Sequence, residues 1–375
     1  MDLSYTEEQA LLKDSVQKFI EDNYDITVRN KLTESDEGFS RENWQQYADL
    51  GWLAMAFAEE DGGIGGSAVD TMVLMEEFGK GLVVEPFLST VVMAGTAISE
   101  FGSAEQKSSL IPAIIEGSLI ATVAYAESQA HHELNNVVTS AEKSGDSWII
   151  NGAKSVVANA RSAGKILVSA RTSGAPRDES GITMFIVDAD ASGISRDDYP
   201  TVDGLRASEI TFENVEVPAS NMLGEEGEGL AILNKISNRA ILALSAEAVG
   251  AMEMLYKDTI AYTKQREQFG HPLSDFQVLK HRMTEMFMEH QLAKSLTMKA
   301  TMLESHDAED TQRTIHALKY LIGKSSRFVG QNAVQLHGGM GMTEELRIAH
   351  YFKRLTVIDA QFGNTDHHLT CFVEL

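Results

Sequence analysis

The stretch Arg266-Glu267-Gln268-Phe269-Gly270-His271-Pro272-Leu273 separates two long helical patterns. In the first pattern, mostly apolar side chains recur at spacings of three and four, which places them on one face of a helix. They are Ile241, Leu244, Ala248, Met252, Leu255, Thr259 and Tyr262. We expect this helix to begin after Gly229 and to end at Gly270 and Pro272, because these residue types break the helical hydrogen-bond ladder.

A second helix is expected after a cap at Ser274 or Asp275. Its inner face is predicted to carry Phe276, Leu279, Met283, Met286, Phe287 and His290. Two long helices joined by a short turn predict an antiparallel helical hairpin. The rest of the chain is arranged around this hairpin.

Composition limits the classes of protein that fit. A chain of 375 residues exceeds what one hydrophobic core usually serves, so two or three domains are expected. The net charge of −24 disfavours nucleic acid and anionic membrane as partners. The single cysteine, Cys371, excludes an internal disulfide framework and a cysteine-based metal cluster.

Neither a membrane span nor a secretory leader is indicated. No apolar run approaches the roughly 20 residues that a transmembrane helix needs, and the start, Met1-Asp2-Leu3-Ser4-Tyr5, has no basic region followed by an apolar one. A cytoplasmic location is the expectation.

The chain changes character twice. Helical spacing dominates residues 1–118, alternating Val, Ile, Thr and Ser dominate 119–226, and helical spacing returns over 227–375. The expected fold class is therefore α+β, with a helical domain, a β domain and a second helical domain over those three ranges. Within the β domain, Asn151-Gly152 between two apolar runs predicts a hairpin turn. The glycine-rich residues 61–66 predict a tight turn rather than a phosphate-binding loop.

Few residues offer chemistry of their own. His281, His290 and His316 are scattered over helices without the spacing of a metal site, so no metal is expected. No G-x-S-x-G motif of a serine hydrolase is present. Arg266, at the end of the first long helix, has an ordinary interpretation as a group that hydrogen-bonds the last helical carbonyls.

Two motifs in order give Arg266 another interpretation. They are Arg266-x-x-Phe269-Gly270-x-Pro272-Leu273-x-x-Phe276-Gln277 and Gln335-Leu336-His337-Gly338-Gly339-x-Gly341. Together with the helix, strand, helix layout, these motifs resemble the acyl-CoA dehydrogenase family of flavoproteins over nearly the whole chain. The resemblance implies a helical domain, a β domain and a C-terminal four-helix bundle, with FAD as cofactor and an acyl-CoA thioester as substrate.

The resemblance also implies roles for individual residues. Arg266 would bind the pyrophosphate of FAD, since a guanidinium fork can contact phosphate oxygens bidentately. Phe269 and Gln277 would lie beside the adenosine half. Gln335, Gly338 and Gly339 would reach FAD bound mainly to another subunit, which implies at least a dimer. Electrons would pass to electron-transfer flavoprotein or a similar external carrier.

The sequence departs from the family pattern in three places. Val156 and Ala158 stand where a Trp and a Thr usually contact the flavin ring, and Ala126-Glu127-Ser128-Gln129 replaces a stretch resembling Thr-Glu-Pro-Gly. Phe362 stands where the family usually has its catalytic glutamate. A phenylalanine cannot accept a proton.

Dehydrogenation needs a base, because the α-proton of the thioester must be removed as a hydride leaves the β-carbon. Some members of the family carry the glutamate on the first long bundle helix, where this chain has Glu247 in an apolar run. Glu247 is the first candidate for the base, and Asp366, near the C-terminal turn, is the second.

Three functions remain open on the sequence. The first is an FAD-dependent acyl-CoA dehydrogenase. The second is a non-catalytic subunit that completes the FAD site of a related chain, as in the two-chain heterotetramers of one sub-branch of the family. The third is a flavin oxidase or monooxygenase on the same scaffold.

Overall fold

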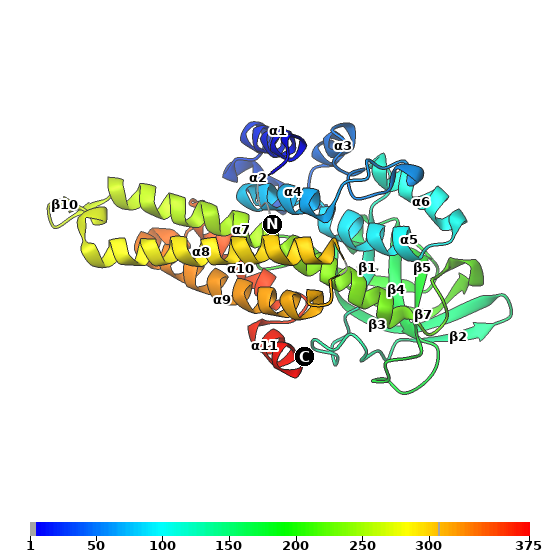
Figure 1. Ribbon diagram of the computed structural model, residues 1–375. Helices are drawn as coiled ribbons and strands as arrows, with labels where there is room; N and C mark the ends of the chain where they lie inside the picture. Colours follow the sequence, from blue (N-terminus) through cyan, green and yellow to red (C-terminus); the bar gives the residue numbers. More distant parts are fainter. Residues whose placement is uncertain (1–4, 307) are drawn as a thin grey trace. The chain divides into compact units, whose positions relative to one another are not determined.

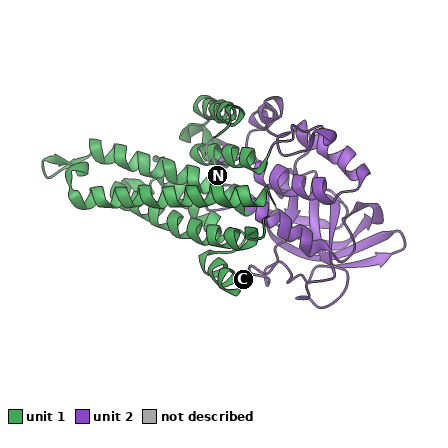
Figure 2. Ribbon diagram, in the orientation of Figure 1, with its two compact units in different colours: residues 1–31, 67–83, 241–375 green, residues 32–66, 84–240 purple. Residues whose placement is uncertain are grey.

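The computed structural model describes residues 5–306 and 308–375. The chain divides into two compact units, which Figure 2 colours separately. Unit 1 comprises Met1–Lys31, Ser67–Val83 and Ile241–Leu375, and unit 2 comprises Leu32–Gly66 and Val84–Ala240. Each unit therefore collects segments that are distant in the sequence.

Unit 1 is helical, and long helices run alongside one another in it (Figure 1). Helix α9 packs against α8, α10 and α11, and α4 packs against α1 and α8. The long elements are α7 (Gly229–Gln265, of which the part from Ile241 lies in unit 1), α8 (Gln277–Glu304), α9 (Thr311–His337) and α10 (Arg347–Ala360). The remaining ones are α1 (Glu7–Asn23), α2 (Ile26–Glu34), α4 (Ala68–Gly81), α11 (Thr365–Glu374) and the 3-10 turns η5 (Leu273–Asp275) and η6 (Gly338–Met342).

Helices α4 and α7 cross with their backbones in close contact. A Cβ atom at Gly79 would lie 2.0 Å from the carbonyl oxygen of Glu247, and one at Gly250 would lie 1.9 Å from that of Glu76. Only glycine permits such an approach. The crossing fixes the position of Glu247 against α4.

Unit 2 contains one twisted sheet in the order β6-β7-β3-β2-β4-β5-β8, with β1 paired in parallel with β4. Its core is formed by apolar side chains of alternate strand positions, among them Ile150, Val168, Phe185 and Phe212. The strands are β1 (Ala121–Ala124), β2 (Ser140–Ser144), β3 (Ser147–Ala158), β4 (Lys165–Arg171), β5 (Ile182–Asp188), β6 (Ile194–Pro200), β7 (Arg206–Pro218) and β8 (Met222–Leu223).

Short helices complete unit 2. They are α3 (Arg41–Asp49), α5 (Thr96–Phe101), α6 (Ala104–Ile115), the π-helix η2 (Leu88–Gly95) and the 3-10 turns η1 (Glu59–Asp61), η3 (Ala160–Ser162) and η4 (Ala219–Asn221). Gly62 and Gly65 have φ angles of 88° and 72°, so residues 61–66 form the tight turn that the sequence predicts. No helix in the described ranges has both the length and the apolar content needed to cross a bilayer.

The structure confirms the predicted order of helices, strands and helices, and it confirms both arms of the long hairpin. The predicted turn at Asn151-Gly152 is wrong, because β3 continues through both residues and pairs with β7 across a register shift there. The turn lies instead at Gly145 and Asp146, between β2 and β3. Phe287, expected on the inner face of α8, is 44% exposed.

Candidate functional site

The turn between α7 and α8 presents three of the predicted site residues on the surface. Arg266, Phe269 and Gln277 are all exposed, and the short strands β9 (Glu267–Gln268) and β10 (His271–Pro272) pair between them. Phe269 has a φ angle of 57° and is 89% exposed, with only an edge contact to the ring of Phe276. A large aromatic ring held in solvent in this way is a group available to a ligand or a second subunit.

The backbone of Arg266 is fixed while its side chain is not. Its amide donates to the carbonyl of Tyr262 at 2.9 Å, and its own carbonyl accepts from Leu273 at 2.8 Å. Within residues 5–306 and 308–375, the guanidinium forms no hydrogen bond or ion pair. The ordinary role as a cap of the helix is therefore absent there, and the guanidinium is available for an anion.

The second motif lies at the end of α9. Gln335, Gly338 and Gly339 are exposed, and a Cβ atom at either glycine would meet no atom within 4 Å. The φ angle of 64° at Gly338 turns the chain sharply after the helix. The backbone amides of this turn are open to close approach by a large ligand.

The ends of α7 and α9 are in contact. The ring of His337 stacks on that of Tyr262 with centroids 4.3 Å apart, and the Tyr262 hydroxyl donates to the His337 carbonyl at 3.4 Å. Tyr262 lies one helical turn before Arg266. The structure thus brings both motifs to one end of unit 1, although they are about seventy residues apart in the sequence.

Glu247 forms a buried ion pair that the sequence did not reveal. It is 5% exposed, and its two oxygens accept from Nε and Nη2 of Arg354 on α10 at 2.5 and 2.7 Å. This is the bidentate geometry in which arginine binds carboxylates most strongly. Within unit 1 the carboxylate of Glu247 is buried and both of its oxygens face Arg354, so its assignment as the base stays a prediction.

The second candidate base, Asp366, is exposed in the first turn of α11. The neighbouring Phe362 has a φ angle of 56° and is held there by its carbonyl, which bonds Nε2 of His368 at 2.9 Å. Lys319 of α9 donates to the carbonyls of Asp359 and Gly363 at 2.9 and 2.7 Å. The loop that carries Phe362 is therefore fixed from both sides.

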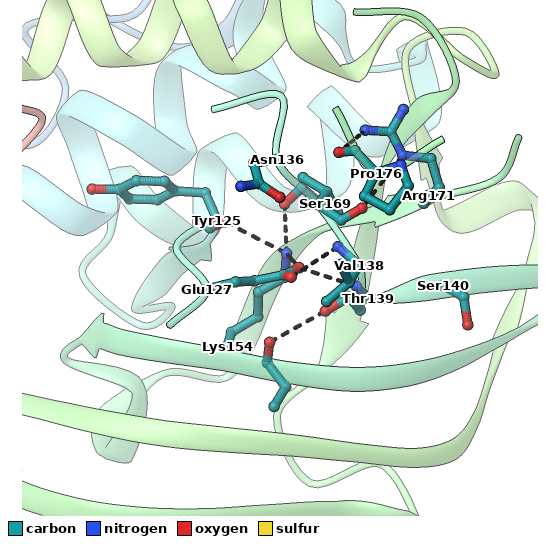
Figure 3. A network of polar contacts seen from close by, with 12 residues as sticks. Tyr125, Glu127, Asn136, Val138, Thr139, Ser140, Lys154, Ser169, Arg171 and Pro176 are labelled. Carbon is teal, nitrogen blue, oxygen red and sulfur yellow. Dashed lines mark hydrogen bonds and ion pairs between the residues drawn. The ribbon is translucent and has the colours of Figure 1, made fainter. Parts of the chain in front are cut away.

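Unit 2 contains a polar network around Lys154, shown in Figure 3. Lys154 is fully buried, and its ammonium group donates to Oε1 of Glu127 at 2.6 Å, to Oγ of Ser169 at 2.9 Å and to the carbonyl of Tyr125 at 3.5 Å. Burial lowers the pKa of Lys154 to about 8, although Glu127 opposes the shift. Burial alone would raise the pKa of Glu127, but the charge and hydrogen bond of Lys154 bring it below its ordinary value.

The strand end beyond Lys154 carries Val156 and Ala158. Val156 is 59% exposed with a φ angle of 53°, and the pairing of β3 with β7 shifts register between Lys154 and Val157. Such a bulge redirects a side chain away from the ladder. Ser128 and Gln129, in the other segment expected near a flavin, are exposed as well. Both segments thus offer surface to a flat ligand.

These features fit FAD at several points. The unpaired Arg266 guanidinium suits phosphate oxygens, the open glycines 338 and 339 allow close backbone approach, and Val156 offers an apolar surface to a ring. In the described part of the chain, no three His, Cys, Asp or Glu side chains lie close enough to hold a metal ion.

Family models for acyl-CoA dehydrogenases match the chain in three parts. The model of the N-terminal domain matches residues 6–118, that of the middle domain residues 122–215, and that of the C-terminal domain residues 227–372. The predicted boundaries at residues 118 and 226 stay predictions, since the two compact units group the segments in another way.

Curated relatives align over nearly the full chain. The long-chain specific acyl-CoA dehydrogenase of Sus scrofa mitochondria is 30% identical over 353 residues, covering 92% of this chain and 81% of its own. The probable acyl-CoA dehydrogenase YngJ of Bacillus subtilis is 27% identical over 371 residues, covering 98% and 97%.

Solved structures agree with this match. Butyryl-CoA dehydrogenase from Megasphaera elsdenii superposes with a TM-score of 0.91 at 26% identity, covering 100% of this chain and 99% of its own. The Tcur3481-Tcur3483 steroid ACAD superposes with a TM-score of 0.89 at 28% identity, covering 98% and 97%. The chain therefore belongs to the acyl-CoA dehydrogenase family of FAD-dependent oxidoreductases.

Proposed function

We propose that this chain removes two hydrogens across the α,β bond of an acyl-CoA thioester and passes the electrons to an external carrier such as electron-transfer flavoprotein. The observation that carries the proposal is the guanidinium of Arg266, which has no hydrogen bond or ion pair within the described residues and lies at the same end of unit 1 as the exposed turn at Gly338 and Gly339, in a chain of net charge −24. A cation kept free of carboxylates in so acidic a protein is suited to a phosphate-bearing cofactor.

In this proposal Arg266 holds the pyrophosphate of FAD, Phe269 and Gln277 contact its adenosine half, and Gly338 and Gly339 offer backbone amides to FAD bound mainly by another subunit. FAD supplies the acceptor for the hydride that leaves the β-carbon of the substrate. The protein must remove the α-proton, exclude water and hold the thioester in place. The product is the α,β-unsaturated thioester.

Glu247 stays our first candidate for the base and Asp366 the second. An ionised carboxylate has about four lone-pair sites, and Arg354 uses two of those of Glu247. Proton transfer therefore requires either a remaining lone pair that faces the substrate or release from the guanidinium. The carboxylate of Asp366 is exposed instead, so water competes with the substrate for hydrogen bonds to it.

The same observations favour a second candidate function, a partner subunit that completes the FAD site of a related chain. Phe362 cannot accept a proton, and the only candidate on α7 is engaged by Arg354. The similar steroid ACAD carries a double name, Tcur3481-Tcur3483, which is a further reason to test a two-chain assembly.

One experiment separates the two functions. The chain is purified alone, its visible spectrum is recorded, and acyl-CoA thioesters of several lengths are added without oxygen. A yellow protein that an acyl-CoA bleaches supports the enzyme. A colourless chain contradicts it and supports the partner subunit, whereas a yellow chain that no thioester bleaches contradicts it and supports a flavin oxidase or monooxygenase on the same scaffold.

A further variant tests the position of the base. If Phe362 is the reason for absent or slow chemistry, Phe362→Glu should increase the rate of flavin reduction, because the loop is already fixed by Lys319 and His368. Phe362→Gln, which has a similar shape and cannot act as a base, is the matched control. Equal rates for the two variants would exclude this position.

A further inference from the structure

Two segments of unit 2 that the resemblance to the family places near the flavin are bonded to each other. The amide of Ser155 donates to the carbonyl of Ala126 at 2.9 Å, and the hydroxyl of Thr122 donates to the carbonyl of Ala158 at 2.6 Å. One segment follows β1 and the other is the end of β3. Their relative position is therefore set by local bonds within unit 2.

The bulge in β3 explains why these bonds exist. The pairing of β3 with β7 holds Lys154 opposite Ile210, is interrupted, and resumes with Val157 opposite Ser208. The amide of Ser155 is thereby released from β7 and bonds the segment after β1 instead. The same interruption turns Val156 outward, where it is 59% exposed.

Lys154 is the last paired residue before this interruption, and its side chain reaches the other segment (Figure 3). Its ammonium group bonds the carbonyl of Tyr125 and the carboxylate of Glu127, and it also bonds Ser169 on β4. Three acceptors for three N–H groups satisfy a fully buried ammonium. Loss of any of these three acceptors would leave one N–H group of the buried ammonium without a hydrogen-bond partner.

Glu127 completes the link. Its carboxylate accepts from the amides of Val138 and Thr139 at 2.9 and 3.1 Å and from the side chain of Gln129 at 2.7 Å, besides Lys154. Glu127 thus ties the segment after β1 to the residues that lead into β2. No apolar pair of the same volume could make these bonds to the backbone.

We propose that Lys154 and Glu127 are a positioning pair for the flavin, which holds the segments 125–129 and 154–158 in the arrangement that the cofactor needs. This inference rests on the proposed function for the presence of FAD and on the family resemblance for the assignment of the two segments to the flavin. Neither residue contacts the reacting atoms in this proposal. They act through the backbone of Tyr125 and Ala126 and through the direction of Val156.

A buried ion pair could instead serve stability alone. Replacement of such a pair by apolar residues is often neutral for stability, whereas removal of one partner is strongly destabilising. The two roles therefore differ in the double variant. A positioning pair loses cofactor affinity even when the fold is as stable as the wild type.

The test uses the full chain with the variants Lys154→Met, Glu127→Leu and the double variant. For each, the dissociation constant of FAD, the absorption maximum of the bound flavin and the denaturant midpoint are measured. We expect the double variant to unfold at a lower denaturant midpoint, because the amides of Val138 and Thr139 lose their acceptor, and to bind FAD about 10- to 100-fold more weakly, a loss of affinity that Phe185→Leu does not show at a similar midpoint. Its flavin absorption maximum should also shift.

Two controls keep the outcome interpretable. Phe185→Leu lies in the core of the same sheet outside the network and should lower the denaturant midpoint with little change in FAD affinity. Ser169→Ala removes one bond of the ammonium and should change affinity and spectrum in the same direction as the double variant, to a smaller extent. Ser169→Ala still tests the proposal if the variants of Lys154 and Glu127 do not fold.

Three results separate the hypotheses. If the double variant and Ser169→Ala both keep the wild-type FAD affinity and absorption spectrum, the proposal that Lys154 and Glu127 position the flavin is wrong. The proposed function would be unaffected by that result. If FAD affinity decreases in parallel with the denaturant midpoint in all variants, including Phe185→Leu, the pair acts through stability alone. That result would also overturn the proposal. A wild-type chain that binds no FAD, either alone or with a related chain, would overturn the proposed function itself.

Discussion

At the scale of single residues, the pairing of Glu247 with Arg354 gives two opposed predictions for one variant. If Glu247 is the base, Glu247→Gln should retain fold and FAD and slow flavin reduction by at least ~100-fold, the lower end of what positioned base catalysis contributes. If Glu247 only neutralises Arg354, the variant removes the carboxylate that faces a buried cation and should lose about 3–5 kcal/mol of unfolding free energy. Stopped-flow flavin reduction and denaturant titration measure the two quantities.

Arg354→Met is the matched control for Glu247→Gln, because it breaks the same pair and keeps the carboxylate. A base at Glu247 predicts that flavin reduction persists in Arg354→Met. Wild-type reduction rates in Glu247→Gln would place the base elsewhere, with Asp366 or a carboxylate of a partner chain next.

Arg266 gives a second prediction at this scale. Arg266→Ala should weaken FAD binding about 10- to 150-fold, since a hydrogen bond to a charged group contributes about 1.5–3 kcal/mol. Lys264→Ala removes an exposed positive charge from the last turn of the same helix and should have little effect. Equal losses in both variants would mean that charge alone, rather than the guanidinium at this position, binds the cofactor.

At the scale of elements, a histidine pair attaches α11 to α9. Nδ1 of His316 lies 2.9 Å from Nδ1 of His368, Gln312 bonds Nε2 of His316, and Nε2 of His368 bonds the carbonyl of Phe362. Amide donation by Gln312 makes His316 the donor to His368, whose own proton lies on Nε2. A second proton on His368 would therefore face the N–H group of His316.

Acid should weaken this attachment. Burial, with the nearby Lys319, His316 and His367, lowers the pKa of His368 to about 3, although its bond to the Phe362 carbonyl opposes the shift. Because the folded pKa lies below the unfolded value, the stability is fully present above pH 6.5 and is lost as the pH falls toward 3. The loss for one proton approaches about 1.4 kcal/mol per pH unit.

Denaturant titrations between pH 7 and pH 4 measure this slope. His368→Asn should flatten it, whereas His281→Asn, at an exposed position on α8, should leave it unchanged. A slope that is identical in wild type and His368→Asn would mean that other groups govern the acid sensitivity.

The elements also show what sequence patterns can predict. The long helices were predictable because apolar side chains recur on one face over many turns. The turn at Asn151-Gly152 was not, since the same dipeptide here occupies a register shift inside a long strand, where Oδ1 of Asn151 accepts from the amide of Asn214. Strand β6 has no such pattern in the sequence, because it is mostly exposed and polar and lacks the alternation of a half-buried strand.

At the scale of the whole molecule, the candidate site was predictable only where it lies in short motifs. Arg266 and the glycines at 338 and 339 became candidates in this way, and their roles stay predictions. Arg354 was not, because it is 107 residues from Glu247 and belongs to no motif. The network of Lys154 and Glu127 was missed for the same reason, since its members come from four separate segments of unit 2.

The last prediction concerns assembly. Gln335, Gly338 and Gly339 share one end of unit 1 with Arg266, and all are exposed, as the resemblance requires of groups that reach FAD bound mainly by another copy. Helix α8 also exposes Phe287, Met288 and Leu292. Apolar side chains gathered on one exposed helix often mark a contact between subunits. We therefore expect the folded protein to be at least a dimer at micromolar concentration.

Light scattering combined with flavin absorbance tests this expectation and the function together. One FAD per chain in an assembly of identical chains supports the dehydrogenase, because each copy then both binds and completes a site. A colourless assembly that gains flavin only with a related chain supports the partner subunit. A monomeric mass with flavin retained would contradict the shared site, since Gly338 and Gly339 would then have no second copy to serve.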